Sequence, residues 1–244
     1  MRGAAIQYKD LAEILARTDS QCHRRLREVD AVLIFYDNIY MYGPPPLAIP
    51  FDENNSQIPT TQKGVIRKRV ADMIMDAIGT NGLKAVIGRG ADYYGPYVIH
   101  SLLYFSFLER MLLGKPPLCI VKPGVKHTYA NTTDCGKALV ALALDESTYG
   151  QVWHLPVNEP VTIEDVVAMF NSELGTKFAA SFIPKPVQKI LSLVNPPLRE
   201  ASEMLSQSDT EYVMSFDKFK RHFREFAVTP YSRGFREMIQ SFQH

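Results

Sequence analysis

AVLIFYDNIYMYGP, residues 31–44, is the stretch of sequence that decides the fold. Its first six residues are apolar on both faces, which is typical of a strand buried in a parallel sheet. The polar pair Asp37-Asn38 follows, and Gly43 with the prolines after it ends the segment in a loop. Because ligands bind beyond the carboxyl ends of parallel strands, this loop is a candidate site.

KAVIGRGADYYGP, residues 84–96, has the same form, with a buried strand leading into a polar, glycine-containing loop. Between the two strands, an apolar stripe predicts a helix over residues 62–78. Thr61 is its expected N-cap, and Gly79 and Gly82 are its expected stops. This strand–helix–strand order predicts an α/β fold with a parallel sheet.

Further elements are expected on both sides of these strands. An acidic capping box at Thr162–Asp165 predicts a helix that runs to about Leu174. The prolines after Lys115 mark the clearest change in composition. Helical spacing is found over 9–28, 100–113 and 134–144, and short strands are expected over 119–122, 127–130 and 151–155.

Composition excludes several classes of protein. The 244 residues include 27 Lys and Arg against 26 Asp and Glu, so charge gives no argument for nucleic acid or an anionic membrane as a partner. Three scattered cysteines favour a reduced, cytoplasmic compartment. No stretch approaches the roughly 18 apolar residues of a membrane span. The histidines lack metal-ligand spacing, and no metal is predicted.

Three segments, taken together, resemble the NAD-dependent epimerase/dehydratase family of extended short-chain dehydrogenases/reductases. They are DNIYMYGP at 37–44, GRGADYYGP at 88–96 and HTYANTTD at 127–134. In the family these positions hold a hydroxyl pair followed by Val-Tyr-Gly, then Arg-x-x-Asn-x-Tyr-Gly-Pro, then a segment ending in Val-x-Asp. The resemblance implies a partial Rossmann-like parallel sheet with a small C-terminal α/β substrate lobe. Residues 1–114 would form the partial NAD(P)-binding domain, and 115–244 the lobe, interleaved with the sheet.

The resemblance also implies catalytic roles. Family members use a Tyr as general acid/base and a Lys four residues later that lowers its pKa. Lys63 matches this Lys, but Pro59 stands where the Tyr should be. Tyr40 or Tyr42 is therefore the candidate acid. The alternative is that Tyr40 packs and Lys63 is a solvated lysine at a helix start.

Other positions are assigned in the same way. Asp37 and Asn38 occupy the hydroxyl region, where they could take part in catalysis and Asn38 could hold the substrate; alternatively, both simply cap the strand. The candidate cofactor contacts are Lys63, Asp92, Tyr93 and Arg89, and Tyr94 is a candidate substrate contact. For Arg89 the alternative is a structural ion pair under the sheet.

The sequence shows no match to the family's glycine-rich, phosphate-binding turn. Gly88-Arg89-Gly90 follows a strand, but the next glycine is Gly95, which is too far on, and no helix follows directly. Two to three βα units, on the order of 80–100 residues, would precede residue 31 in a relative. NAD or NADP is therefore expected to bind weakly. The strand at 31–36 would be an open sheet edge, which predicts weak monomer stability or a homodimer through that edge.

Two functions remain open from the sequence. The first is an enzyme derived from an epimerase, dehydratase or reductase, with a sugar nucleotide or similar carbonyl compound as its small-molecule substrate. The second is a non-catalytic nucleotide- or partner-binding module, or an inactive truncated remnant, of the same fold. Pro59 and the absent glycine turn favour the second, whereas Lys63 and Asp92 favour ancestry in the first.

Overall fold

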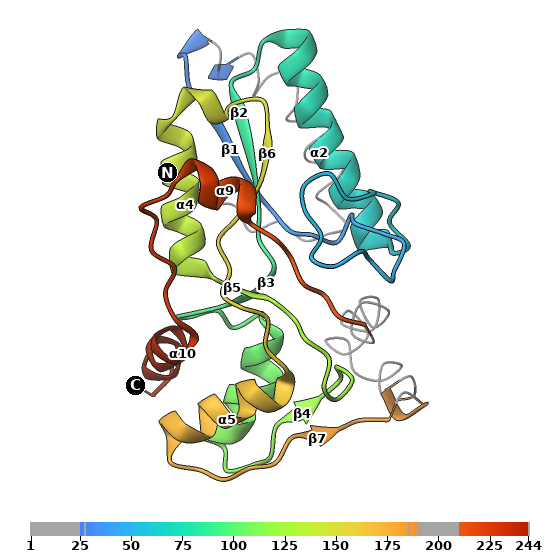
Figure 1. Cartoon of the computed structure of the whole chain (residues 1–244), viewed down its shortest axis with the longest axis vertical. Helices are drawn as coiled ribbons and strands as arrows, with labels where there is room; N and C mark the ends of the chain where they lie inside the picture. The colour runs from blue at the N-terminus through green and yellow to red at the C-terminus, as the bar shows by residue number, and fades with distance from the viewer. Residues whose placement is uncertain (1–24, 27, 185, 189, 191–209, 244) are drawn as a thin grey trace.

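The computed structural model describes residues 25–26, 28–184, 186–188, 190 and 210–243. Strands and helices alternate through most of this range (Figure 1). Their order is β1 (Leu33–Asp37), α2 (Gln62–Asn81), β2 (Ala85–Arg89), β3 (Asp92–Tyr94), the π-helix η1 (Leu103–Leu108), α3 (Glu109–Leu112), β4 (Leu118–Cys119), β5 (Tyr129–Asn131), α4 (Thr132–Leu144), the 3-10 helix η2 (Glu146–Thr148), β6 (Val152–His154), α5 (Ile163–Leu174), β7 (Ser181–Phe182), α9 (Asp217–His222) and α10 (Tyr231–Gln240).

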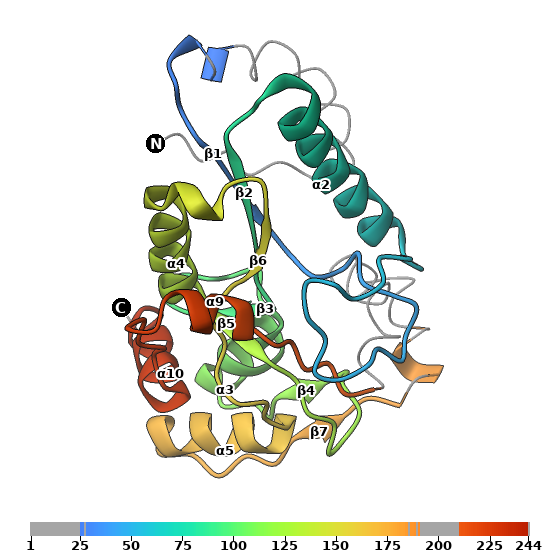
Figure 2. The same cartoon turned by 45° about the horizontal axis from the view of Figure 1, so that its top comes forward.

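The main sheet is parallel, with strand order β1-β2-β6. Its register sets Asp37 beside Arg89 and Arg89 beside His154, so the last residues of the three strands form one row. Helices α2 and α4 cover opposite sides of the sheet (Figures 1 and 2). Strand β2 is buried at every residue, as expected for the central strand of a sheet covered on both faces.

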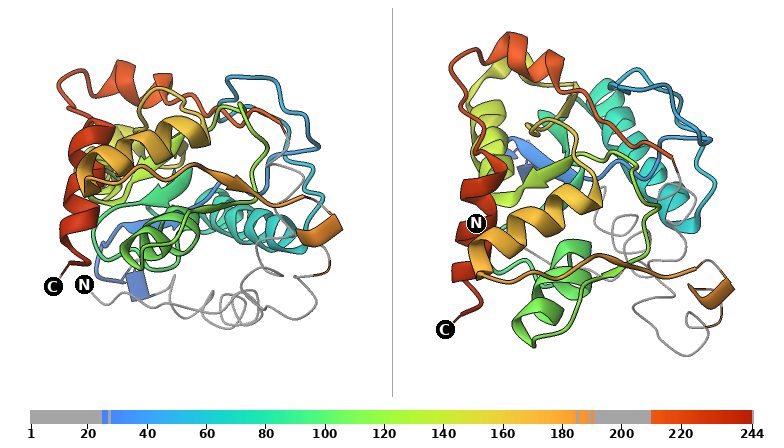
Figure 3. Two further views of the ribbon diagram at one scale, coloured as in Figure 1. Left: turned by 90° about the horizontal axis from the view of Figure 1, so that it is seen from below. Right: turned by 60° about the horizontal axis from the view of Figure 1, so that its bottom comes forward.

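The second half of the chain builds two smaller parallel pairs, β3–β5 and β4–β7. Helices α5 and α10 pack side by side against this region (Figure 3). A core of large apolar side chains joins them to η1, among them Phe107, Phe170 and Phe235, each fully buried. Strand β6 and helix α9 return to the main sheet, so the elements of the main sheet and of the smaller strand pairs alternate along the chain.

The α/β fold with a parallel sheet is confirmed, and so are two caps. The Thr61 side chain accepts from the backbone N–H of Gly64, and Thr162 and Asp165 form the reciprocal capping box of α5. The stop at Gly79 is wrong. Gly82 ends α2 instead, because it adopts the left-handed conformation (φ 64°) that a helix C-terminus requires.

Three other expectations need adjustment. The helix expected over 100–113 is a π-helix that continues as the short helix α3. The helix expected from residue 134 begins at Thr132, because the Asn131 side chain accepts from two N–H groups of its first turn. The helix expected over 9–28 falls almost wholly outside the described residues. Among the described helices, none is long and apolar enough to cross a membrane.

Candidate functional site

The carboxyl edge of the main sheet carries a buried polar network. Arg89 is 1% exposed and uses all three guanidinium nitrogens. Its Nε donates to Asp37 Oδ2 at 3.3 Å, one terminal nitrogen to Tyr42 Oη at 2.9 Å, and the other to Gln57 Oε1 at 3.2 Å. Arg67 lies 3.6 Å from the other oxygen of Asp37. The alternative role of Arg89, a structural ion pair, matches this geometry.

His154 completes the network and fixes its proton positions. Its Nδ1 lies 2.8 Å from the carbonyl oxygen of Ser215, which can only accept, so Nδ1 carries the proton. Its Nε2 must then accept, and Tyr42 donates to it at 2.6 Å. The Tyr42 hydroxyl thus donates a hydrogen bond to His154 and accepts one from Arg89. Both of its strongest hydrogen-bonding directions are used inside the protein.

Burial dominates the titration of these groups. It raises the pKa of Tyr42 to about 12, although Arg89 acts in the opposite direction. It lowers the pKa of His154 to about 3, because an imidazolium there would be desolvated and would face Arg89. Burial also raises the pKa of Asp37, while Arg89 and Arg67 oppose that rise. At neutral pH the imidazole is therefore neutral and the phenol protonated, and the network holds protons in place rather than moving them.

A second group of candidate residues lies next to the network, where the loop after β1 meets α2. Asn38 is buried, and its side chain accepts from the backbone N–H of Tyr40 at 3.1 Å, as the strand-capping alternative requires. The carbonyl oxygen of Tyr40 contacts Gly64 so closely that no Cβ would fit there. Lys63, the residue before Gly64, is half-buried in the first turn of α2. The fold thus brings the Tyr40 backbone against the turn that carries Lys63.

The candidate residues after β2 lie on the short ladder β3–β5. Asp92 is half-buried and pairs in register with Tyr129, and burial raises the pKa of its carboxyl to about 6. The Tyr93 hydroxyl donates to the Asp37 carbonyl at 2.9 Å. Tyr94 is fully buried and packs on Phe235 with ring centroids 4.8 Å apart. Only Tyr93 of these three contacts the strand-end network directly.

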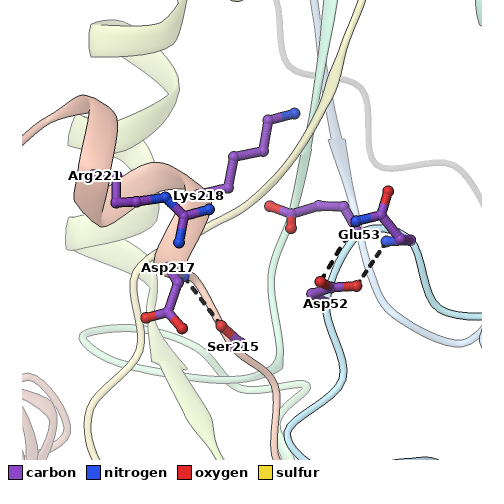
Figure 4. Close-up of a pocket in the computed structure, with 7 residues that line it drawn as sticks. Asp52, Glu53, Ser215, Asp217, Lys218 and Arg221 are labelled. Atoms are coloured by element: carbon purple, nitrogen blue, oxygen red, sulfur yellow. Dashed lines mark hydrogen bonds between the residues drawn. The ribbon is translucent and has the colours of Figure 1, made fainter.

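The outer edge of β6 is covered by charged side chains. Glu53 accepts from the backbone N–H of His154 at 2.7 Å, and Lys218 donates to the Val152 carbonyl at 2.7 Å. The Lys218 ammonium also lies over the Trp153 ring, 4.1 Å from its centroid. A polar cavity of about 260 Å³ lies here between the loop at Asp52–Glu53 and α9. Figure 4 shows the side chains that line it. These side chains take the place of a neighbouring strand.

Sequence reasoning missed three members of the site. The sequence-based assignment gives His154, Gln57 and Glu53 no role in the site. A signal for His154 was available, because it comes at the end of a predicted strand and the carboxyl ends of parallel strands lie at one edge. No such signal existed for Gln57 and Glu53, which reach the site from a long loop.

The buried histidines predict a pH dependence. His154, and His127 with its pKa lowered by burial to about 4, bind protons more readily when unfolded, where the pKa is about 6.5. Stability should therefore fall as the pH drops below about 6.5. Asp92 and Asp37 act oppositely, because burial raises the pKa of both carboxyls and so favours the folded state on acidification. The contribution of the histidines is therefore isolated by substituting one of them.

We therefore expect the urea midpoint of unfolding to decrease from about pH 7 to about pH 5. His154→Gln should flatten this dependence, whereas His100→Gln, at an exposed position, should leave it unchanged. A His154→Gln chain that keeps the wild-type pH dependence would contradict the assignment of a neutral buried imidazole at His154.

Comparison with known proteins shows the fold. No protein-family model and no curated protein matches the sequence. Among solved structures, the UDP-glucuronic acid 4-epimerase of Bacillus cereus in complex with NAD superposes with a TM-score of 0.73 at 15% identity, covering 100% of this chain and 73% of that protein. The dTDP-glucose 4,6-dehydratase of Streptomyces venezuelae with NAD and TYD bound gives 0.70 at 16%, covering 100% and 71%. The UDP-glucose 4-epimerase of Thermus thermophilus gives 0.69 at 18%, covering 99% and 76%. The Rossmann-like fold implied by the sequence is confirmed.

Proposed function

We propose that this chain is an NAD-dependent epimerase/dehydratase-like protein that acts on a sugar nucleotide or a similar carbonyl compound. The observation that carries the proposal is the contact between Tyr40 and the first turn of α2, which sets a phenol-bearing loop beside Lys63 at the carboxyl edge of a Rossmann-like sheet. Residues 1–114 serve as the partial nucleotide-binding domain and 115–244 as the substrate lobe. The solved structures of the same fold include NAD complexes of sugar-nucleotide enzymes, which supports this choice.

The described residues are better suited to hold the nicotinamide and its ribose than the pyrophosphate of NAD. Lys63 supplies a cation that can donate to ribose hydroxyls, and Asp92 and Tyr93 follow the central strand at the same edge. When bound, the nicotinamide would accept or return a hydride. Within the described part of the chain, no glycine-rich turn joins a strand to a helix N-terminus, so the pyrophosphate lacks its usual cradle. This mismatch supports weak binding of either NAD or NADP.

The candidate residues have separate proposed roles in catalysis, in the substrate site and in fixing the strand ends. Tyr40 supplies the proton at its phenol oxygen, and Lys63 favours the phenolate by its charge. Asn38 lies on the substrate side of this loop, whereas the fully buried Tyr94 and Asp37 act through packing on Phe235 and through the ion pair with Arg89. Tyr42 and Arg89 act by fixing the strand ends, since their polar atoms are taken up by Asp37, Gln57 and His154.

A pocket of about 430 Å³ beside β4 and β7 supports a nucleotide-linked substrate. Its walls are apolar, with Ile120 and Phe182 among them, and Lys122 stands on its lining. Gln188 is 3% exposed and donates to the carbonyls of Ile120 and Ile183, but its Oε1 has no partner among the described residues. A flat heterocycle with an N–H donor, such as a pyrimidine base, would satisfy that oxygen.

The second candidate is a non-catalytic nucleotide-binding module of the same fold. It is favoured by the commitment of Tyr42, one of the two candidate acids, to His154 and Arg89. With Pro59 at the usual acid position, Tyr40 is then the other candidate acid in the loop at 37–44. If Tyr40 does not reach a substrate, the site can bind but not turn over.

Calorimetric titration tests the binding part. We expect NAD and NADP to bind with Kd on the order of 1 mM, far weaker than micromolar, because the phosphate cradle is lacking. Lys63→Met should weaken binding further, whereas Lys68→Met, which removes an exposed lysine of the same helix, should not. Micromolar affinity would show that other groups of the chain bind the pyrophosphate in place of a glycine-rich turn. No saturable binding, or equal binding by both variants, would count against the proposed cofactor site.

Turnover separates the two candidates. A panel of UDP- and dTDP-sugars would be incubated with the chain and excess NAD, and products separated by chromatography. The enzyme candidate predicts slow conversion that falls by about 10²-fold or more in Tyr40→Phe. The control is Tyr104→Phe in η1, where the Tyr104 ring packs against Phe242; this variant should keep the wild-type rate. Binding without conversion would support the non-catalytic module.

The proposal also includes a cytoplasmic location and a homodimer. Cys119 and Cys135 are free and buried, which suits a reducing compartment. The outer edge of β1 offers the surface for a dimer.

A further inference from the structure

The two edges of the main sheet differ in how they are protected. At the β6 edge, Glu53 accepts a hydrogen bond from the outward-facing N–H of His154, and Lys218 donates one to the outward-facing carbonyl of Val152. Strand β1 forms the opposite edge and pairs with β2 alone among the described strands. Charged side chains at an edge are a common defence against pairing with another chain. Charged side chains protect the β6 edge in this way, whereas none of the described residues is seen to protect the β1 edge.

The geometry of β1 shows which groups face outward. The N–H of Leu33 donates to Lys84, and the carbonyl of Asp37 accepts from Gly90, so both ends of the strand point toward β2 and the segment after it. Because backbone groups alternate in direction along a strand, those of Phe35 also face β2. The N–H and C=O groups of Ile34 and Tyr36 therefore face away from the sheet. Both of these residues are 37% exposed.

We propose that β1 pairs with β1 of a second copy of this chain, antiparallel and centred on Phe35. In this register Ile34 lies opposite the partner's Tyr36, and each such pair exchanges two N–H···O bonds. Phe35 lies on the two-fold axis beside its own copy. The two three-stranded sheets then become one continuous sheet with an isologous interface.

The chemistry of the strand fits a second copy of itself. Residues 33–36, LIFY, carry no charge, so no like charges meet across the axis. The nearest charged groups are already paired, Asp30 with Lys84 at 2.7 Å and Asp37 with Arg89 at 3.3 Å. Cross-strand contacts between aromatic and β-branched side chains stabilise antiparallel pairs. The interface is small, so the dimer should dissociate on dilution in the micromolar range.

This inference rests on the homodimer within the proposed function, but not on nucleotide binding or turnover. Sedimentation equilibrium of the full chain should give a mass near twice that of the monomer at high concentration. Ile34→Lys introduces an ammonium into both copies and should raise the dimer Kd by about tenfold or more. Leu144→Lys, at a position on α4 that is 82% exposed, should sediment like the wild type. Circular dichroism melts check that each variant folds.

A cysteine cross-link tests the register itself. In a non-hydrogen-bonded antiparallel pair the Cα atoms lie about 4.5 Å apart, within disulfide range. Phe35→Cys should therefore form an intermolecular disulfide under mild oxidation, beyond any that the wild type forms. Val65→Cys on α2, which is 48% exposed, should not. A monomer at every concentration overturns the inference. A dimer that withstands Ile34→Lys and forms no Phe35→Cys cross-link overturns it as well, while leaving a homodimer through another surface.

Discussion

Arg89→Leu is expected to lower the free energy of unfolding by about 3–5 kcal/mol, the usual cost of removing one partner from a buried ion pair. The Asp37 side chain is 0% exposed and would lose its hydrogen-bonded cation, keeping only Arg67 at 3.6 Å. Tyr42 and Gln57 would each lose a donor as well. Urea unfolding followed by circular dichroism measures the change.

A matched control is Arg233→Leu, which breaks an exposed pair with Glu237 one helical turn away. Its cost should be below about 1 kcal/mol, because solvent screens such pairs. The double variant Asp37→Leu, Arg89→Leu should recover part of the loss, since no buried charge is then left alone. If Arg89→Leu costs no more than Arg233→Leu, the buried network does not stabilise the strand ends.

Gly64→Ala is the second substitution with a large expected effect, a loss of about 1–3 kcal/mol from overpacking. The added Cβ would collide with the carbonyl oxygen of Tyr40 and lie 2.8 Å from Cβ of Pro59. Backbone atoms cannot turn aside as a flexible side chain can, so the loop or the helix start must shift. Any binding that depends on Lys63 should weaken with it.

Gly79→Ala provides the control within the same helix. A Cβ there meets nothing within 4 Å, and the residue is helical, so alanine should stabilise the chain by about 0.5–1 kcal/mol. The two glycine variants should thus change the urea midpoint in opposite directions. A Gly64→Ala chain as stable as the Gly79→Ala chain would show that the Tyr40 loop does not pack on α2 as described.

Much of the fold could be predicted from local patterns. The strand at 31–36 and the helix after Thr61 follow from signals within a few residues, and both are confirmed within about two residues at the strand and at the helix start. The C-terminus of that helix was harder, because Gly79 and Gly82 look alike in sequence. Only the backbone conformation of Gly82 distinguishes the true cap.

The site was harder to predict because its parts come from distant segments. Tyr42 and His154 are 112 positions apart in the chain, and their hydrogen bond exists only once β6 joins the sheet. The sequence identified Tyr42 as a phenol near a strand end but could not show that its hydroxyl is occupied. For the same reason, the structural role of Arg89 became visible only with the register of Asp37 against it.

The proposed nicotinamide site lies at the carboxyl edge of the sheet, at the loop after β1 and the first turn of α2. Amide hydrogen exchange, measured by mass spectrometry with and without millimolar NAD, tests it most directly. We expect slower exchange in peptides spanning residues 38–43 and 61–66, no change in α5 and α10, and loss of that protection in Lys63→Met. Protection confined to other segments, or none at saturating NAD, would contradict it.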